Sequence, residues 1–452
     1  MVEHKKQIKK ISLAIVIGLI FFAISSLLFT TQQASLLGII AFLVTLWTNE
    51  GLPLGVVSLL PMVLFPAFGI MATKATTVNY AHPIIFLFLG GFLIAIAVEK
   101  TNLHTWIADK MLELFPSTPR GIIFSLAITA GLLSSVLSNT TTTLLLMSIA
   151  LFLTENKALK MRFALAIAYG ASVGGILTPI GTPPNLILLG VMSDKGMPAI
   201  PFLQWMMMVA PLVFTMFFVV ASILSIGVKD LIVVSSKDKK ELNVPQKRVL
   251  YLIGGLIFFL VLNAPIRPYW DGLGLSEPML LLAFGLMLFL TPFRVLEWEQ
   301  DASKVPYKIM FLFGAGFSIA KAFASTGLAD EFASYLLVIT EFHPIILLLC
   351  IAALITFTTE ITSNTALISI MLPVIYSVAE QSGINTTLFM MVATVCASYA
   401  FMLPIATAPN AIAMSSGAVK IVHMARYGVF LNLIGIGLIV LIAEFFWKGI
   451  LS

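Results

Sequence analysis

The segment VLSNTTTTLL at residues 136–145 has a polar centre, although it lies inside an apolar run. Residues 121–154 are 34 in number and include no Asp, Glu, Lys or Arg. A straight helix of that length would extend about 51 Å, whereas the hydrocarbon core of a bilayer is about 30 Å thick. The segment is too long for one crossing and too short for two. It therefore predicts a re-entrant helical hairpin that turns at Ser138, Asn139 and Thr140.

The composition places the whole chain in a membrane. Hydrophobic residues make up 59% of it, charged residues only 10%, and the mean hydropathy is +1.04. Apolar runs of membrane length recur from end to end, which predicts a polytopic helical membrane protein and excludes a soluble domain. The first run, residues 11–30, is expected to be a retained helix rather than a cleaved signal. Two cysteines, Cys350 and Cys396, and five scattered histidines predict neither a disulfide framework nor a metal site.

The chain repeats itself at one fixed spacing. The SNT motif at Ser138 recurs at Ser363, and 363 − 138 = 225. PIGTPPNLI begins at Pro179 and PIATAPNAI at Pro404, while FLGGFLIA at residue 88 corresponds to FGAGFSIA at residue 313, again 225 apart. Three matched blocks at one spacing indicate two halves derived from one ancestral unit.

The basic residues predict that the two halves have opposite orientations. The segments that flank the first hairpin carry six cations, Lys100, Lys110, Arg120, Lys157, Lys160 and Arg162. The matching segments of the second half, residues 323–345 and 380–387, carry no Lys or Arg. Because cytoplasmic loops are enriched in Lys and Arg, this asymmetry predicts an inverted-topology repeat. The lysine-rich N-terminus is expected inside, in the cytoplasmic membrane, and the C-terminus outside.

The expected fold is therefore all-α, with about 11 transmembrane helices, two re-entrant hairpins and two broken helices. We place the first helix in residues 1–32 and a cytoplasmic linker in residues 229–249. The first repeat covers 33–228, with its hairpin at 121–154 and its broken helix at 163–193. The second repeat covers 250–452, with its hairpin at 344–379 and its broken helix at 385–419.

The breaks GGILTPIGTPPN at residues 174–185 and LPIATAPN at residues 403–410 are predicted to face the hairpin tips. Proline removes a backbone donor and glycine permits unusual dihedral angles, so each break leaves free amides at a new helix N-terminus. Such ends favour an anion. No Lys or Arg lies in the four elements, so an anion must be held by amides, hydroxyls and bound cations. The hydroxyl, amide and carbonyl oxygens there also suit sodium.

Glu360 is the one charged residue within either hairpin. Carboxylates at membrane depth are functional candidates by default. Glu360 either helps to couple a cation or pairs structurally with a cation such as Lys321. An enzyme is disfavoured, because Ser138 or Ser363 as a nucleophile would have only Glu360 as a base. Paired inverted halves favour a carrier over a channel. A cation/proton antiporter is disfavoured because it would depend on buried ionisable residues, and the site regions offer only Glu360.

The two SNT tips, VEKTNLH at residues 98–104, TEITSNT at residues 359–365 and the paired proline breaks resemble the divalent anion/sodium symporter family. The resemblance covers nearly the whole chain. It implies transport of dicarboxylates, citrate or sulfate by a homodimer. Each protomer would have a scaffold domain and a transport domain that moves as an elevator.

The resemblance also implies specific site residues. The substrate-binding positions would be Ser138, Asn139, Thr140, Thr182, Ser363, Asn364, Thr365, Thr407 and Ala408. The first sodium site would comprise Ser134, Ser138, Asn139 and the backbone near Gly181, and the second Thr359, Ser363, Asn364 and the backbone near Ala406. The chain departs from many relatives at Thr141, where they carry Ala, and its two breaks differ because Ala408 in the second stands where Pro183 stands in the first.

These patterns lead us to expect a secondary transporter of C4-type dicarboxylates, such as succinate, malate, fumarate and 2-oxoglutarate. Sodium is the expected coupling ion, no other cofactor is expected, and the chain should act as a homodimer in the bilayer. A sodium-independent dicarboxylate exchanger and a sulfate or citrate carrier are the alternatives.

Overall fold

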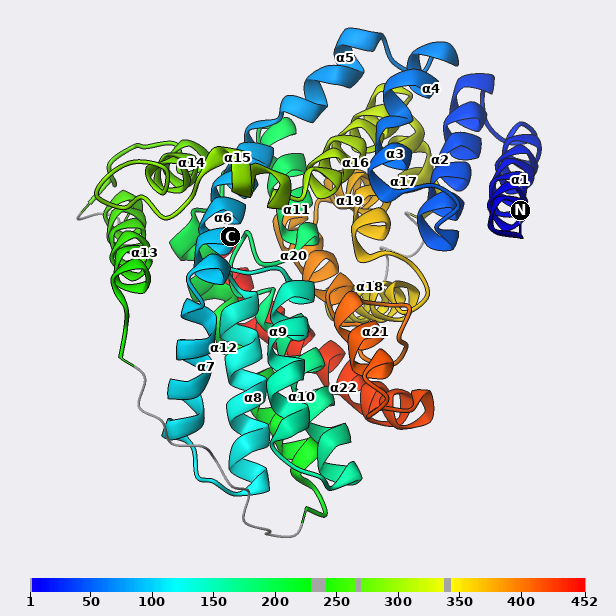
Figure 1. Cartoon of the computed structure of the whole chain (residues 1–452). Coiled ribbons are helices and arrows are strands. Elements are labelled where there is room, and N and C mark those ends of the chain that lie inside the picture. The colour runs from blue at the N-terminus through cyan, green and yellow to red at the C-terminus, as the bar shows by residue number, and fades with distance from the viewer. Residues whose placement is uncertain (1, 229–240, 266–269, 337–342, 452) are drawn as a thin grey trace.

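The computed structural model describes residues 2–228, 241–265, 270–336 and 343–451, and its regular elements there are helices (Figure 1). The all-α expectation is confirmed. Most of the predicted linker, residues 229–240, lies outside the described residues.

The first half consists of thirteen helical elements. They are α1 (Val2–Ser25), α2 (Thr31–Asn49), α3 (Leu54–Leu59), α4 (Pro61–Ala67), α5 (Thr73–Thr77), η1 (Val78–Ala81), α6 (Pro83–Lys100), α7 (Leu103–Leu114), α8 (Pro119–Ser134), α9 (Asn139–Phe152), α10 (Lys157–Gly174), α11 (Pro183–Asp194) and α12 (Phe202–Ser225).

The described part of the second half follows the same plan. Its elements are α13 (Val244–Asn263), α14 (Glu277–Met287), α15 (Trp298–Asp301), η2 (Ala302–Lys304), α16 (Tyr307–Ser325), α17 (Leu328–Leu336), α18 (Pro344–Thr359), α19 (Asn364–Ser382), α20 (Thr386–Ala397), α21 (Ala408–Ser415), α22 (Ile421–Ile442), η4 (Ala443–Trp447) and α23 (Lys448–Leu451).

Helix starts follow the capping chemistry of the sequence. Thr118 accepts a bond from the Gly121 amide, at 3.2 Å, with a proline in the first turn of α8. Asn243 forms a capping box with Gln246 at the start of α13. These side chains satisfy amides that the first helical turn leaves free.

Eight helical segments of the described chain are long and apolar enough to cross a membrane. The arms of the first hairpin, α8 and α9, fall among the shorter apolar helices, with 16 and 14 residues. At 1.5 Å per residue they extend about 24 and 21 Å, less than a hydrocarbon core of about 30 Å. These lengths suit a re-entrant hairpin, while its re-entry from one side and the total of 11 crossings stay predictions.

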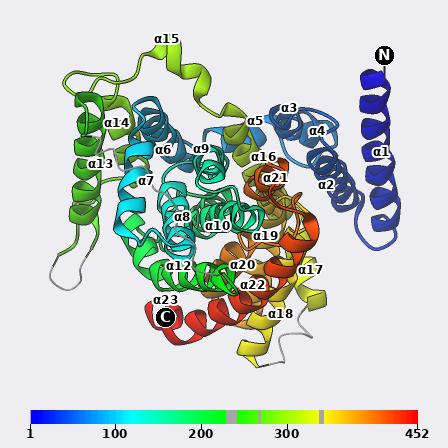
Figure 2. The same ribbon diagram turned by 60° about the horizontal axis from the view of Figure 1, so that its bottom comes forward.

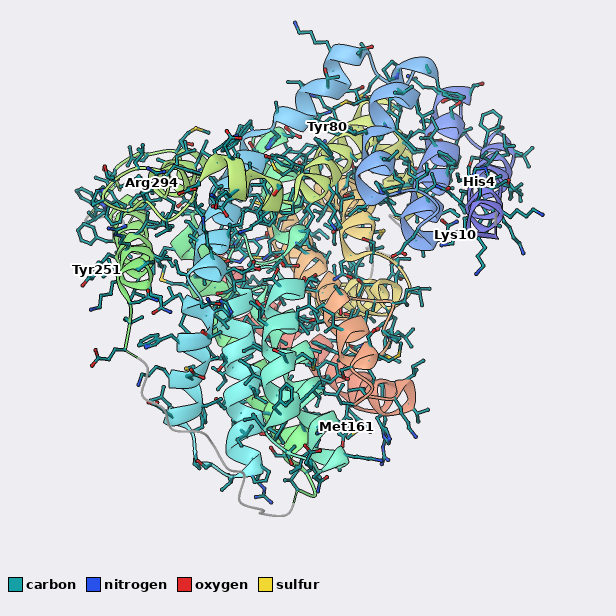
Figure 3. The ribbon with its side chains drawn as sticks, viewed as in Figure 1. His4, Lys10, Tyr80, Met161, Tyr251 and Arg294 are labelled. Carbon is teal, nitrogen blue, oxygen red and sulfur yellow. The ribbon has the colours of Figure 1, made fainter. Side chains whose placement is uncertain are left out.

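The peripheral helices lie at opposite edges of a central bundle (Figures 1 and 2). The pair α1 and α2 forms one edge, where Figure 3 labels His4 and Lys10, and α13 and α14 form the other, where it labels Tyr251 and Arg294. In the bundle, α10 packs against α8 and α12, and α20 packs against α18 and α19.

The two halves interlock at the second arm of each hairpin. Helix α9 packs against α21 of the second half, and α19 packs against α11 of the first half. Each hairpin therefore contacts the broken helix of its own repeat and that of the other repeat. These contacts between the halves bring the two hairpin tips and the two helix breaks together.

Candidate functional site

The first hairpin turns at residues 135–138, so Ser138 lies in the turn, whereas Asn139 and Thr140, which were also predicted there, begin α9. Ser138 caps α9, because its hydroxyl accepts a bond from the Thr141 amide at 3.1 Å. Ser134, at the end of α8, donates its hydroxyl to the Asn139 side-chain oxygen at 2.5 Å. The side chain of Ser134 is fully buried. These bonds fix the Asn139 amide at the tip.

The second hairpin repeats this contact. The Thr359 hydroxyl lies 2.6 Å from the Asn364 side-chain oxygen and 2.9 Å from the Ala397 carbonyl oxygen. Both oxygens are acceptors, so they share the single proton of this hydroxyl. Ser363 is the N-cap residue of α19 but makes no side-chain capping bond. Both predicted sodium sites thus contain a hydroxyl paired with a tip asparagine, Ser134 with Asn139 and Thr359 with Asn364.

The helix breaks fall on the proline motifs. Residues 175–182 separate α10 from α11, and residues 398–407 separate α20 from α21. Thr182 and Thr407 are the N-cap residues of the second segments, both in extended backbone conformation. Gly181 lies so close to the preceding turn that a Cβ would come within 2.4 Å of the Gly175 carbonyl oxygen, which explains a glycine at this position.

Sequence reasoning did not single out the two asparagines that stabilise the breaks. The Asn185 amide donates to the carbonyl oxygen of Thr178 at 2.9 Å, and the Asn410 amide donates to those of Ala400 and Leu403 at 2.9 and 3.0 Å. Both side chains are fully buried. The signal was present, because each asparagine ends a quoted proline motif at the common spacing of 225 residues.

A cavity of about 450 Å³ lies where the tips and breaks meet. Its lining includes every predicted substrate-binding residue, namely Ser138, Asn139, Thr140, Thr182, Ser363, Asn364, Thr365, Thr407 and Ala408, together with Gly181 and Ala406. Ser134 and Thr359 do not line it and lie buried behind the tips. The remaining wall is largely apolar and comes from α2, α3, α6 and α16.

The electrostatics of this cavity favour an anion. Four helices have their first residue in the lining of this cavity: α9, α11, α19 and α21. The positive ends of four helix dipoles and their free amides therefore converge on one space. Glu50 is the only charged residue among the lining residues. The cavity can thus bind an anion through amides and hydroxyls without a cationic side chain.

Glu360 lies beside this cavity and braces the second break. Its carboxylate accepts the amides of Phe401 and Met402 at 2.8 and 2.9 Å and that of Leu403 at 3.0 Å. Asn432 of α22 donates a fourth bond at 2.7 Å. The suggested pairing with Lys321 is wrong, because the carboxylate bonds to amides and Lys321 is exposed.

The cavity reaches the face of the molecule where the lysine-rich N-terminus lies. Trp47, Thr48 and Glu50 line it at the end of α2. The side-chain amide of Asn49 there donates to the Lys10 carbonyl oxygen at 3.0 Å. The end of α2 that borders the cavity is therefore the end next to the basic segment of α1.

Comparison with known proteins relates this arrangement to transporters. A family model described as citrate transporter matches residues 39–392. The sodium-dependent dicarboxylate transporter SdcS of Staphylococcus saprophyticus is 30% identical, over 100% of this chain and 95% of its own length. The protein of the same name from Staphylococcus aureus is 28% identical, over 97% of this chain and 92% of its own length.

Two solved structures share the fold at low sequence identity. The YdaH transporter of Alcanivorax borkumensis superposes with a TM-score of 0.59 and 16% identity, over 83% of this chain and 88% of that one. MtrF of Neisseria gonorrhoeae gives a TM-score of 0.58 and 15% identity, over 81% and 83%. At such identities the likeness concerns the fold alone.

Proposed function

This chain belongs to the citrate transporter family, and we propose that it carries C4-type dicarboxylates, such as succinate, malate, fumarate and 2-oxoglutarate, together with sodium across the cytoplasmic membrane. The family consists of membrane transporters rather than enzymes. The observation that supports the substrate class is the convergence of four helix N-termini on one cavity that has no Lys or Arg in its lining. The two SdcS relatives are named as dicarboxylate transporters.

A dicarboxylate suits this cavity because the site has two equivalent ends. Asn139 and Thr140 begin one hairpin arm, and Asn364 and Thr365 begin the other. Each tip, with the break that faces it, offers amide and hydroxyl donors for one carboxylate. A C4 dianion would therefore engage both tips at once, whereas a monocarboxylate would engage only one.

Sodium would compensate the charge of the dianion. A dianion held away from water costs free energy unless opposite charge lies nearby. We place one sodium ion at Ser134, Ser138, Asn139 and the Gly181 backbone. The second would lie at Thr359, Ser363, Asn364 and the Ala406 backbone. The names of the SdcS relatives, which are described as sodium-dependent, support this assignment.

The transport movement would be of the elevator type within a homodimer. The hairpins and broken helices would move as one body, since α9 packs on α21 and α19 on α11. The scaffold would include α2, α3, α6 and α16, which supply the other wall of the cavity. With the N-terminus inside, the cavity at the end of α2 would correspond to an inward-facing state.

Proteoliposomes test the coupling directly. Uptake of labelled succinate is measured into empty vesicles with an inward sodium gradient, and then without sodium but with unlabelled succinate inside. Symport predicts accumulation only in the first condition, and weaker accumulation in Ser134→Ala and Thr359→Ala. Uptake that requires internal substrate and ignores sodium would instead identify a sodium-independent exchanger.

Competition tests the substrate class. Fumarate and succinate should inhibit each other's uptake, while butyrate should not, because it has one carboxylate. Stronger inhibition by sulfate or citrate than by fumarate would favour a sulfate or citrate carrier of the same family.

A further inference from the structure

A second cavity of about 250 Å³ adjoins the substrate cavity at the tip of the first hairpin. Its lining shares Phe92, Leu137, Ser138, Thr140 and Ile309 with the larger cavity. The two spaces therefore meet along residues that line both of them. We call the smaller one the lysine cavity, because Lys304 and Lys308 line it together with Glu99.

The lysine cavity brings cations close to a site that has none of its own. Lys308 lies in the first turn of α16, is exposed, and has no ion pair recorded within the described chain. One turn further along α16, Leu312 lines the substrate cavity, and Ile309 lines both. Lys308 can therefore attract an anion that approaches the tip of the first hairpin.

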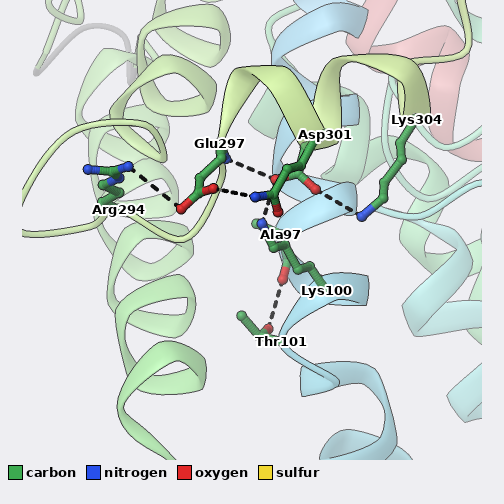
Figure 4. A network of polar contacts seen from close by, with 8 residues as sticks. Ala97, Lys100, Thr101, Arg294, Glu297, Asp301 and Lys304 are labelled. Atoms are coloured by element: carbon green, nitrogen blue, oxygen red, sulfur yellow. Dashed lines mark hydrogen bonds and ion pairs between the residues drawn. The ribbon is translucent and has the colours of Figure 1, made fainter.

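Lys304 is held in place by a shared carboxylate (Figure 4). Its ammonium nitrogen lies 2.8 Å from one oxygen of Asp301, and that of Lys100 lies 2.6 Å from the other. Burial alone would raise the pKa of Asp301, but hydrogen bonds from Lys100, Lys304 and the Glu297 amide lower it to about 2. One carboxylate balances two lysines, so the group of Lys100, Lys304 and Asp301 keeps a net positive charge.

The inverted repeat provides an internal comparison for these lysines. At the common spacing of 225 residues, Lys304 corresponds to Asn79 and Lys308 to Pro83, at the start of α6. Asn79 is buried and donates to the Ala75 carbonyl oxygen at 3.0 Å. The two positions equivalent to the lysine pair, Asn79 and Pro83, therefore carry no charge.

We infer that the lysine cavity is an anion subsite through which a dicarboxylate reaches or leaves the first tip on the face of the N-terminus. The inference rests on the proposed dicarboxylate substrate. Lys308 and Lys304 would attract the dianion and hold it briefly before it passes Ser138 and Thr140. Since a charge at the rim of a site acts mainly on the association rate, the lysines should govern apparent affinity on that face and leave the turnover rate unchanged.

Counterflow in membrane vesicles of opposite orientation tests this inference. Labelled succinate enters vesicles loaded with unlabelled succinate at equal sodium on both sides, so a symporter and an exchanger both give a signal. In everted vesicles, Lys308→Gln should raise the KM about fivefold with an unchanged maximal rate, and Lys304→Gln should raise it less. In right-side-out vesicles neither change should alter the KM. Lys308→Arg should retain the wild-type KM on both faces.

Lys420→Gln is the matched control, because Lys420 is an exposed lysine outside both cavities. Choline chloride, added at constant sodium, should raise the KM of the wild-type protein, since salt screens the attraction between Lys308 and the dianion. The same addition should raise the KM of Lys308→Gln less. The inferred subsite is contradicted if Lys308→Gln has the same KM as Lys420→Gln in everted vesicles, or if it shifts the KM equally on both faces. Absence of succinate counterflow in the wild-type protein would instead overturn the proposed substrate.

Discussion

The two halves of this transporter build the same hairpin and break by different physical means. In the first half, α8 and α10 touch through glycines, because a Cβ on Gly174 would lie 2.1 Å from the Gly131 Cα. At the equivalent positions, the second half has Tyr399 and Thr356. Tyr399 lies in the break after α20 and its ring packs on Gly435 of α22, so the glycine contact between α8 and α10 has no counterpart at these positions.

The junction between hairpin and break differs in the same way. In the first half, the Thr178 hydroxyl donates a short bond to the Ser135 carbonyl oxygen. The equivalent positions in the second half are Leu403 and Glu360, and there the Glu360 carboxylate binds three successive backbone amides. One topology is thus stabilised by close backbone packing in one half and by a buried charge in the other. The two halves therefore share the geometry of the hairpin and break but differ in the interactions that support it.

The largest expected effect tests whether both halves serve the substrate equally. Asn139→Ala and Asn364→Ala should each reduce the initial rate of succinate uptake about 100-fold, since each removes a tip amide that we propose to contact the dianion and a sodium ion. Ser148→Ala, an exposed position on α9, is the control for expression and folding. Near-normal uptake by either asparagine variant would mean that its half does not contribute to the site.

The next effect concerns the glycine contact of the first half. Gly174→Ala should lower the free energy of unfolding by about 3 kcal/mol, because the added methyl group overlaps the backbone of α8. Thermal unfolding in detergent, followed by tryptophan fluorescence, measures the loss. Gly437→Ala in α22 has open space around it and should be neutral or slightly stabilising. Equal stability of the two variants would contradict direct contact between α8 and α10.

Glu360 provides the corresponding test of the second half. In Glu360→Gln one oxygen is replaced by an NH₂ group, which cannot accept a backbone amide. The loss should be about 1–3 kcal/mol of stability, together with a lower uptake rate. Glu380→Gln, an exposed carboxylate at the end of the same hairpin, is the control. If unfolding and uptake are unchanged in Glu360→Gln, the carboxylate does not brace the break.

The hydrogen bond between Thr178 and Ser135 in the first half is expected to contribute least to stability. Thr178→Val removes the neutral hydroxyl bond to Ser135 and should cost about 1 kcal/mol, less than the loss at Glu360. Thr178→Ser keeps the hydroxyl and should restore most of the stability. The same thermal unfolding measurement applies, and a loss larger than that of Glu360→Gln would reverse the proposed ranking of the two junctions.

The sequence alone determined the hairpin turns and the helix breaks. Ser138 and Ser363 are polar residues inside apolar segments, which is unusual and marks the turns. Each break carries prolines in the first turn of the helix segment that follows it, a position that proline favours. These are local effects of residue type, so they can be read without knowing the neighbours in space. The repeat spacing of 225 residues then identified which elements meet. The substrate-binding residues came from the family resemblance, and every one of them lines one cavity.

Which distant groups support that cavity could be seen only in the folded chain. Glu360 and Asn432 are 72 positions apart, and the sequence left the partner of Glu360 open between a coupling cation and Lys321. The lysine cavity likewise joins α6, the first tip and the start of α16, three segments with no common motif. Such contacts depend on how helices cross after folding. Residue type and spacing constrain each helix separately, but they do not specify which side chains face each other across the crossing.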